Sequence, residues 1–360
     1  HDYNTIRTAG GDISASTKSD IIAGKATGTV QDYFTAATEW SNIQQALELD
    51  QLDQILEPMA RRLVTDLELD LGLFMRKNTG LNYGARDTAV DAWSDVAGAG
   101  AMMDAVGVPM SDNKYYLMNP FTTTSLASAQ NGLNASDGLV RTAWEKAQIS
   151  SNFGGMRALT SNALSSYTSG STTDRAGTLD GAPDATYVTA KDTMQQTLVI
   201  DALGTGTIVA GDQIQIAGVN RLNIATRQVM LDAAGAAVPW TGTVLSTVTI
   251  AANAATIVVS GAAIYEANGQ YNTVDAAPAD GAVVTILGTA ATVYQPNLFY
   301  TEQAFGLGTV KLPKLYSTDT VATTEDGMSI RVSKYSDGDT NTQKVRFDLL
   351  PAYATFNPFM

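Results

Sequence analysis

Residues 52–77 read LDQILEPMARRLVTDLELDLGLFMRK, and their apolar side chains recur at steps of three, four and seven residues. This period places them on one face of an α-helix. Pro58 is unfavourable inside a helix but suits a first helical position. We therefore predict a short helix that ends near Glu57 and a long helix over residues 58–77. The residues expected on the apolar face are Leu52, Leu56, Met59, Leu63, Leu67 and Phe74.

Three acids lie on this helix, at Asp66, Glu68 and Asp70. Grouped carboxylates can bind a metal ion. On a helix, however, residues two apart point in different directions, so the three cannot all face one ion. A solvated helix face is the favoured interpretation. Residues 67–71 also alternate with the two-residue period of a β-strand, which leaves a strand as the alternative here.

Upstream, residues 1–40 are predicted to form an extended arm. Their apolar residues are spread among Thr, Ser, Gly and Asp, and Gly10-Gly11 and Ala23-Gly24 are turn signals. So few apolar residues cannot form a core of their own. The arm is either a flexible terminus or a hairpin that lies on another molecule, and composition favours neither. Because the chain does not begin with Met, we also expect a segment upstream of it.

Downstream, a second helix is predicted over residues 89–106, with Thr88 and Asp91 as a capping box. A short strand over 114–119 and another helix over 139–149 follow it. Helix, strand and helix with short connections indicate a mixed α/β domain.

The composition changes near residue 165. Residues 165–181 are rich in Ser, Thr and Gly and are predicted to be a linker. Short apolar bursts between turn residues then continue to about residue 294, which indicates a small barrel or a sandwich. Because α/β sequence flanks this region, it is predicted to be an inserted domain. Its clearest strands are expected over 196–200, 213–216, 244–250, 256–259 and 283–287.

After residue 297 the α/β character returns. Residues 328–333 and 345–350 alternate in polarity, and residues 336–339 between them are turn chemistry, which predicts a long β-hairpin. The acids of this turn, together with Asp348, also match several ligand positions of a Ca²⁺ loop. Thr342, however, stands where that loop needs Gly, so a hairpin turn is the favoured interpretation.

The whole chain has 360 residues, 44% of them hydrophobic and 16% charged, which predicts two or three folded domains. Its formal charge of 22 − 36 = −14 argues against a nucleic-acid reader. There is no Cys and one His, at position 1, which excludes disulfides, thiol catalysis and histidine triads. No phosphate-binding, hydrolase or metalloprotease motif occurs. We therefore predict no enzyme and no catalytic, cofactor-binding or metal-binding residues. The uncharged stretch 233–265 is broken by turn residues and predicts strands, not a membrane span.

The order of these modules resembles that of the bacteriophage major capsid (coat) proteins of the HK-ninety-seven fold, and most closely the P-twenty-two-type coat family with its inserted β-barrel. Short strings agree in the family's order, and their colinearity along nearly the whole chain carries the resemblance. These strings are Asn4-Thr5-Ile6, Lys25-Ala26-Thr27-Gly28, Ala92-Trp93, Asn119-Pro120, Gly211-Asp212-Gln213-Ile214, Ala217-Gly218-Val219, Asn297-Leu298-Phe299 and Leu312-Pro313.

The resemblance implies an α+β, HK-ninety-seven-like capsid fold with an inserted all-β barrel domain. It assigns residues 1–40 to the E-loop, 41–87 to the P-domain with its spine helix, and 88–169 to A-domain and P-domain elements. Residues 170–294 become the inserted barrel, and residues 295–360 return to the A- and P-domains with the long hairpin.

The resemblance also implies self-assembly, through E-loop and P-domain contacts, into the icosahedral shell that encloses packaged double-stranded DNA in a virion. The implied partners are further copies in hexamers and pentamers, a scaffolding protein, a portal and a decoration protein, with no membrane and with assembly in the cytoplasm of the bacterial host. Candidate subunit contacts are Asp20, Lys25, Asp32, Arg61 and Arg62, and the inserted-domain motif is Gly211, Asp212, Ala217 and Gly218. The alternatives are a secreted or surface adhesive β-protein and a hydrolase with dispersed acids; neither has a use for the extended arm.

The charge of −14 leads to a hypothesis within this resemblance. A container for DNA should not bind phosphates tightly, because an inner surface that binds DNA obstructs its packaging and its ejection. We expect free subunits to bind duplex DNA weakly in an anisotropy titration at several salt concentrations. Tight binding that weakens steeply with salt would contradict the hypothesis, since that slope reports the number of neutralised phosphates.

Overall fold

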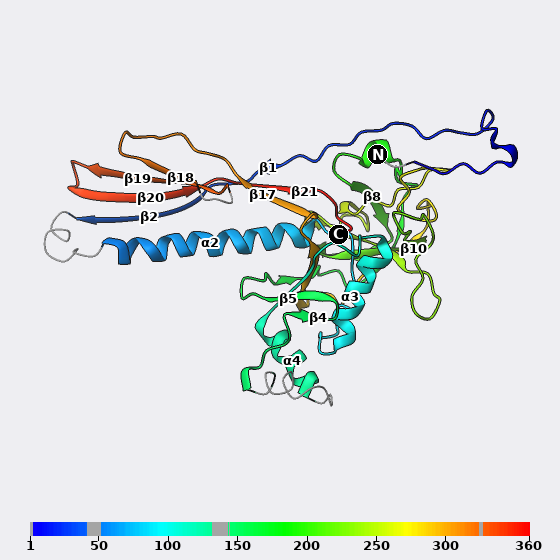
Figure 1. Ribbon diagram of the computed structural model, residues 1–360, viewed down its shortest axis with the longest axis horizontal. Coiled ribbons are helices and arrows are strands. Elements are labelled where there is room, and N and C mark those ends of the chain that lie inside the picture. The colour runs from blue at the N-terminus through cyan, green and yellow to red at the C-terminus, as the bar shows by residue number, and fades with distance from the viewer. Residues whose placement is uncertain (1–2, 42–51, 132–142, 144, 324–326) are drawn as a thin grey trace. The chain divides into compact units, whose positions relative to one another are not determined.

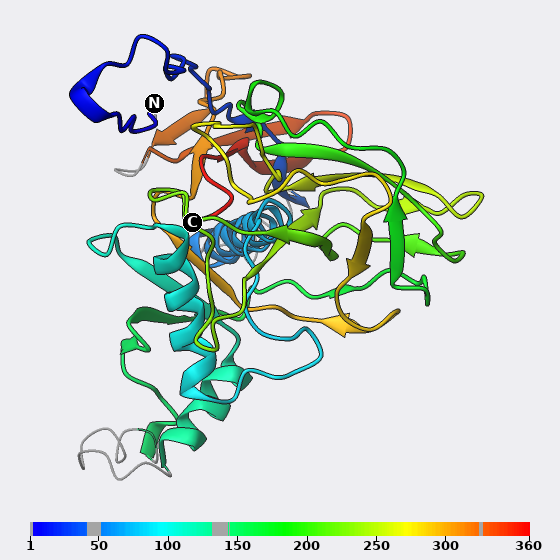
Figure 2. The same cartoon turned by 90° about the vertical axis from the view of Figure 1, so that its right-hand side faces the viewer.

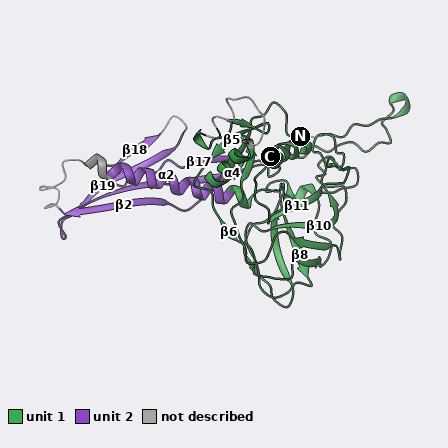
Figure 3. Ribbon diagram, turned by 90° about the horizontal axis from the view of Figure 1, so that it is seen from below, with its two compact units in different colours: residues 1–26, 75–304, 357–360 green, residues 27–74, 305–356 purple. Residues whose placement is uncertain are grey.

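The computed structural model describes residues 3–41, 52–131, 143, 145–323 and 327–360. The chain divides into two compact units, which Figure 3 shows in different colours. Unit 1 comprises residues 1–26, 75–304 and 357–360, and unit 2 comprises residues 27–74 and 305–356. The chain therefore leaves unit 2 near the end of the long helix and returns to it after the inserted region.

Unit 2 is built from a long helix packed on an antiparallel sheet. Helix α2 (Leu52–Lys77) runs along the sheet of order β18-β19-β20-β2 (Figure 1). The strands of this sheet are β2 (Phe34–Ser41), β18 (Thr320–Thr323), β19 (Ser329–Asp337) and β20 (Thr342–Leu349). Leu63 and Leu67 of the helix pack with Leu349 and Tyr353, and each of the four is at most 3% exposed. The predicted apolar face thus covers the sheet.

The long terminal hairpin is confirmed. β19 and β20 pair antiparallel along their length, with Asp337 opposite Thr342 beside the turn, and β2 pairs with the other edge of β20. A second sheet, of order β1-β21-β17, contains β1 (Thr29–Val30), β17 (Phe305–Thr309) and β21 (Pro351–Thr355). The C-terminal part of the predicted arm therefore supplies strands to both sheets of unit 2.

Pro58 lies inside α2, so the predicted helix break near Glu57 is wrong. A proline inside a helix costs about 3 kcal/mol, because it lacks the N–H that would bond to the carbonyl four residues earlier. The helix nevertheless continues on both sides of it, and Leu63 and Leu67 bind the following turns to the sheet. Packing on the sheet outweighs the local cost of proline. The strand alternative for residues 67–71 is also wrong, since they are helical.

Unit 1 contains a mixed α/β part, as predicted. It has the helices α3 (Trp93–Val106) and α4 (Pro120–Asn131) and a sheet of order β16-β3-β5-β4. The strands are β3 (Lys114–Met118), β4 (Asn152–Phe153), β5 (Met156–Thr160) and β16 (Leu298–Thr301). The core between helices and sheet contains the buried side chains of Val96, Met103, Met118, Leu126 and Met156. Among the described helices, none is long and apolar enough to cross a membrane.

Helix α3 begins at Trp93 and not at the predicted residue 89. Ala92 is its N-cap, and the Asp95 carboxylate accepts the backbone N–H groups of Asp91 and Ala92. The capping acid is therefore Asp95 and not Asp91. An acid at this place also suits the positive end of the helix.

Helix α4 has no counterpart in the prediction, because its Thr- and Ser-rich sequence shows no apolar stripe. The side chain of Asn119 starts the helix by accepting the Thr122 N–H at 2.7 Å. Of the helix predicted over 139–149, residues 139–142 and 144 lie outside the described residues; 143, 145 and 146 are helical, but 147–149 are not, so the predicted end is three residues too late.

The inserted region folds into a closed barrel of six strands in the order β10-β11-β13-β8-β7-β14. Figure 2 shows these strands in green to yellow. They are β7 (Ala176–Leu179), β8 (Gln195–Asp201), β10 (Gln213–Asn220), β11 (Pro239–Val244), β13 (Ala255–Ser260) and β14 (Val283–Ile286). Leu198, Trp240 and Ile257 are fully buried in its core. Of the two predicted architectures, the barrel is therefore the one observed.

The region predicted as a linker, 165–181, contains strands. One is the barrel strand β7, and the other is β6 (Tyr167–Thr168), which pairs with β15 (Val293–Tyr294). Small residues hide the strand signal of β7. A Cβ at Gly177 would lie 2.6 Å from the carbonyl oxygen of Asp201, so the close approach of the strands requires glycine there.

The predicted strand 244–250 is divided in the structure. β11 ends at Val244, and β12 (Val248–Thr249) pairs with β9 (Thr207–Ile208) outside the barrel ladder. The residues that the structure describes also include two short helical elements, η1 (Ala9–Gly11) in the arm and α6 (Tyr187–Ala190) before β8.

The two faces of α2 lead to a prediction. We expect Leu67→Ala to lower the free energy of unfolding by about 2–5 kcal/mol, because Leu67 is 3% exposed in the core of unit 2. Leu69→Ala is the matched control: Leu69 lies on the same helix but is 39% exposed, so its effect should stay below about 1 kcal/mol. Urea denaturation of both variants tests this, and equal losses would contradict the packing described above.

Candidate subunit-contact surfaces and the neck of the barrel

The exposed face of α2 carries Arg61 and Arg62. Arg61 Nη2 lies 2.6 Å from Glu57 Oε1, and Arg62 Nη2 lies 3.0 Å from Asp66 Oδ1, each one helical turn away. The two arginine side chains remain 78% and 73% exposed, so these pairs contribute little to the stability of the fold. The predicted contact residues of the helix are therefore accessible to a neighbouring molecule.

The predicted contact residues of the arm, Asp20, Lys25 and Asp32, also have exposed side chains. Asp32 lies between β1 and β2 in unit 2, whereas Asp20 and Lys25 lie in unit 1. The backbones of Asp20 and Lys25 are bound to the barrel: the carbonyl of Asp20 accepts from Gln270, and the N–H of Lys25 donates to Asp192. The barrel thus binds the main chain of the arm at Asp20 and Lys25, and their charged side chains remain exposed to solvent.

The Gly211-Asp212 motif forms the turn that enters β10. Gly211 has a φ of 101°, which L side chains rarely adopt. Asp212 is 1% exposed, and its Oδ2 accepts the backbone N–H groups of Gly170 at 3.0 Å and Val209 at 2.9 Å. Glycine is thus required by the backbone, and aspartate by two backbone amide donors, of which that of Gly170 is buried. Both motif residues are structural in this chain.

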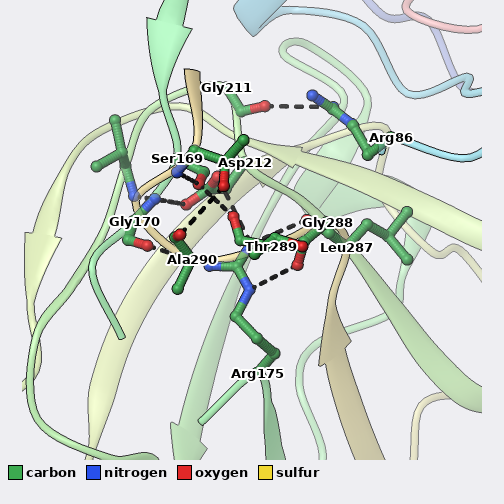
Figure 4. Close-up of polar contacts among 12 residues, drawn as sticks. Arg86, Ser169, Gly170, Arg175, Gly211, Asp212, Leu287, Gly288, Thr289 and Ala290 are labelled. Carbon is green, nitrogen blue, oxygen red and sulfur yellow. Dashed lines mark hydrogen bonds and ion pairs between the residues drawn. The ribbon is translucent and has the colours of Figure 1, made fainter. Parts of the chain in front are cut away.

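We call residues 167–175 and 287–295, through which the chain enters and leaves the barrel, the neck. Arg175 binds its two sides together (Figure 4). The guanidinium donates to the carbonyls of Leu287 at 2.9 Å and Gly288 at 3.1 Å on the outgoing side and of Gly170 at 3.4 Å on the incoming side. It also lies 4.0 Å from Asp212 Oδ1, so its charge balances that of the buried acid.

Two further arginines, Arg76 and Arg86, contact Tyr167 at the neck. The guanidinium of Arg76 lies 4.6 Å from the centre of the ring and donates to Ser165 Oγ at 3.1 Å. Arg86 donates to the Tyr167 hydroxyl and to the Gly211 carbonyl. Burial lowers the pKa of Arg76, which Tyr167 opposes and the charge of Arg86 reinforces. Burial also disfavours the charged form of Tyr167, which raises the pKa of its hydroxyl. Tyr167 thus contacts both cations, Arg76 through the face of its ring and Arg86 through its hydroxyl.

The other half of the inserted-domain motif, Ala217 and Gly218, lies on the exposed side of β10. The register of β10 against β11 shifts between Gln215 and Asn220, and Gly218 has a φ of 77°. This bulge turns Val219 into the barrel, where it is 2% exposed. The motif therefore shapes a strand and supplies no binding group.

The Ca²⁺ interpretation of the terminal hairpin finds no support. Asp348 is buried in the sheet, where its Oδ2 accepts from Arg331 Nη2 at 2.7 Å and its Oδ1 from Arg346 Nε at 2.5 Å and Thr35 Oγ1 at 2.8 Å. Burial raises the pKa of Asp348, but these hydrogen bonds outweigh it and hold the pKa below its ordinary value. Within the described part of the chain, no three His, Cys, Asp or Glu side chains could hold a metal ion together.

Sequence reasoning missed the arginines of the neck. They are dispersed among 22 basic residues, and most of their partners are backbone carbonyls, which no sequence pattern marks. Arg221, which is 1% exposed, was missed for the same reason. It donates to the Thr241 carbonyl at 2.9 Å and to the Gly80 carbonyl, and burial lowers its pKa to about 9. The signal available at the neck was the Gly211-Asp212 pair alone.

Comparison with known proteins gives a consistent result. The family model described as P22 coat protein, gene protein 5, matches residues 1–360. The chain is 46% identical over 365 residues to the major capsid protein of Acyrthosiphon pisum secondary endosymbiont phage 1, covering 100% of this chain and 86% of that protein. Among solved structures, the capsid structure of the Cyanophage P-SCSP1u has a TM-score of 0.45 at 12% identity and covers 99% of this chain and 79% of its own. A structure from Mycobacterium phage Che8 has a TM-score of 0.44 at 13% identity, with coverages of 99% and 80%. Because both TM-scores lie below 0.5, the assignment rests on the sequence matches.

The geometry of the neck leads to a prediction. We expect Asp212→Ala to lower the free energy of unfolding by about 2–4 kcal/mol, because it leaves the buried amide of Gly170 and the half-buried amide of Val209 without an acceptor and Arg175 without its counter-charge. Asp180→Ala is the matched control, an exposed acid at the end of β7, and should change stability by less than about 0.5 kcal/mol. Urea denaturation followed by circular dichroism measures both. If the urea midpoint of Asp212→Ala is no lower than that of Asp180→Ala, Asp212 does not stabilise the neck.

Proposed function

The chain belongs to the P22 coat protein family, and we propose from this premise how its surfaces build a shell. It is a major capsid protein of a phage, a structural component of the shell and not an enzyme. The observation that carries this conclusion is the match of the family model and of a 46% identical major capsid protein over the whole chain. The adhesive β-protein and the hydrolase are set aside by the same matches.

The modules of the shell fold are proposed to follow the assignment made from the sequence. Residues 1–40 would be the E-loop, 41–87 the P-domain with α2 as its spine helix, and 88–169 A- and P-domain elements. Residues 170–294 would be the inserted barrel, and 295–360 the return to the A- and P-domains. The long helix on its sheet, the closed barrel between 176 and 286 and the long terminal hairpin support this assignment.

Neighbouring copies are proposed to meet at the exposed face of α2 and at the arm. On α2, Arg61 and Arg62 stand beside Val64 and Leu69, which are each 39% exposed. A closed shell requires heterologous contacts, in which one patch meets a different patch on the next copy. Asp20, Lys25 and Asp32 of the arm are the proposed contacts on the other side. Many modest contacts suffice, because they act at high effective concentration.

Further partners follow from the proposed role. Copies would group into hexamers and pentamers, with a scaffolding protein and a portal during assembly in the bacterial cytoplasm and a decoration protein on the finished shell. The shell would enclose double-stranded DNA without reading its sequence. The excess of acidic over basic residues, 36 against 22, supports this last point.

Electron microscopy and sedimentation of the purified chain, alone and co-expressed with its neighbouring genes, test the function. We expect closed, uniform icosahedral particles. A chain that stays monomeric even with its co-expressed neighbours would overturn the proposal. Arg61→Glu should reduce the particle yield about tenfold, because one unfavourable contact is repeated throughout the shell.

A swap of charges separates a contact with a neighbour from a role within α2. Arg61 pairs with Glu57 in the same helix at 2.6 Å, so Glu57→Arg combined with Arg61→Glu retains the pair but reverses its direction. If the yield stays low in the swapped variant, Arg61 meets another copy. If the yield returns to that of the unmodified chain, Arg61 acts within the helix and the proposed contact is wrong.

A further inference from the structure

We propose that the inserted barrel carries a clasp for the base of the arm of its own chain. The clasp consists of the turn 266–272 and of residues 187–192, which include α6. It binds the arm through the Asn4 side chain and through the main chain of residues 20–25, and it sets the direction in which the arm leaves the subunit before another copy is met. What the arm does there rests on the proposed function, but the clasp itself is a property of the single chain.

The two legs of the arm converge on the turn 266–272. The backbone N–H of Asn4 donates to Ser19 Oγ at 2.8 Å, which closes the intervening residues into a loop, drawn in dark blue in Figure 1. Asn4 Nδ2 then donates to the Asn268 carbonyl at 2.6 Å, and Gln270 Nε2 donates to the Asp20 carbonyl at 2.5 Å. One turn of the barrel thus binds the arm on both legs.

The outgoing leg is bound again farther along. Tyr271 donates its hydroxyl to the Ile22 carbonyl at 3.3 Å, and Asp192 Oδ1 accepts the N–H of Lys25 at 3.0 Å. The ring of Tyr271 stacks on that of Tyr187, with 3.8 Å between their centres and 16° between their planes. This stack joins the two parts of the clasp, since Tyr187 belongs to α6 and Tyr271 to the turn.

The contacts on this leg use the backbone of the arm. A Cβ at Gly24 would lie 2.7 Å from the Lys191 carbonyl oxygen, so the leg passes the barrel where only glycine fits without a shift. The side chains of Asp20 and Lys25 stay exposed although their backbones are bound. A clasp of this kind orients the arm and leaves its charged groups free for a neighbouring copy.

Hydrogen bonds that do not involve the arm hold the turn 266–272 in shape. The side chain of Asn272 accepts the N–H of Glu266 and donates to its carbonyl, both at 2.9 Å, and Arg227 Nη1 donates to the Asn272 carbonyl at 2.6 Å. Asn268 has a φ of 59°, the left-handed conformation in which its carbonyl receives Asn4. A preorganised site loses little conformational freedom on binding. Because the clasp already orders the base of the arm, the arm loses less conformational entropy when it binds another copy.

A cross-link tests the clasp, because the chain contains no cysteine and any pair introduced is the only one present. Lys25→Cys with Asp192→Cys introduces two thiols at positions that the hydrogen bond from the Lys25 backbone N–H to Asp192 Oδ1, 3.0 Å long, holds close together. We expect the soluble, unassembled chain to form this bond on mild oxidation as a monomer, seen as a faster band on a non-reducing gel. Lys18→Cys with Asp192→Cys is the matched control, since Lys18 binds within the loop, to the Ile13 carbonyl, and should cross-link far less.

The same oxidation of assembled particles decides whose arm is held. A monomer band in soluble chains and in particles supports the proposal. A ladder of dimers and larger species in particles would show that the clasp holds a neighbour's arm and would overturn the assignment to the same chain. Absence of the cross-link in soluble chains, or equal cross-linking of the control, would overturn the clasp. The cross-link in soluble chains is measured before any particle forms. A failure to form particles would therefore contradict the proposed function without affecting the test of the clasp.

Hydrogen exchange gives a second measurement that does not depend on new bonds. Gln270→Ala removes a donor to the arm and should speed exchange of the Lys25 amide about tenfold, the factor expected from loss of one hydrogen bond. Gln228→Ala, at an exposed position on another loop of the barrel, should leave this exchange unchanged. Equal rates at Lys25 in the two variants would show that the turn does not hold the arm.

Discussion

The inserted barrel depends on the bonds at its neck, where the incoming and outgoing segments must lie side by side. Arg175 supplies two of them, because its guanidinium lies on the incoming segment and donates to the carbonyls of Leu287 and Gly288 on the outgoing one. Asp212 completes the arrangement by accepting two backbone amides under the charge of Arg175. A closed barrel has no free edge through which to join another sheet. The side-chain bonds at the neck therefore add to the short pairing of β6 with β15, which lies outside the barrel.

Unit 2 is organised by apolar packing. One face of α2 covers the sheet through Leu63 and Leu67, and the buried ion pair of Asp348 with Arg331 holds two paired strands in register. The other face of the helix carries Arg61 and Arg62, paired within the helix but exposed. A subunit of a shell needs this division, because the face that stabilises the fold cannot also be offered to neighbours.

The arm shows how an extended segment can be directed without a core of its own. Its side chains are mostly exposed, and its base is held through main-chain groups by the barrel. Main-chain recognition tolerates changes of the side chains of residues 20–25 except where the approach is close, as at Gly24. The barrel would then have two roles, held by the rest of unit 1 at its neck and holding the arm at its clasp.

The sequence by itself determined the long helix, the inserted β-region and the terminal hairpin, because hydrophobic period and turn chemistry are local properties. It also excluded thiol, disulfide and histidine-triad chemistry and led to the capsid family through colinear strings. Tertiary structure alone decided the rest. Pro58 stays helical because the following turns pack on a sheet whose strands come from both ends of the chain. β7 is a strand because Gly177 lets it approach β8. The partners of Asp212 and Arg175 are carbonyls and amides far apart in sequence, and a backbone group carries no residue-specific signal until the fold brings it into reach.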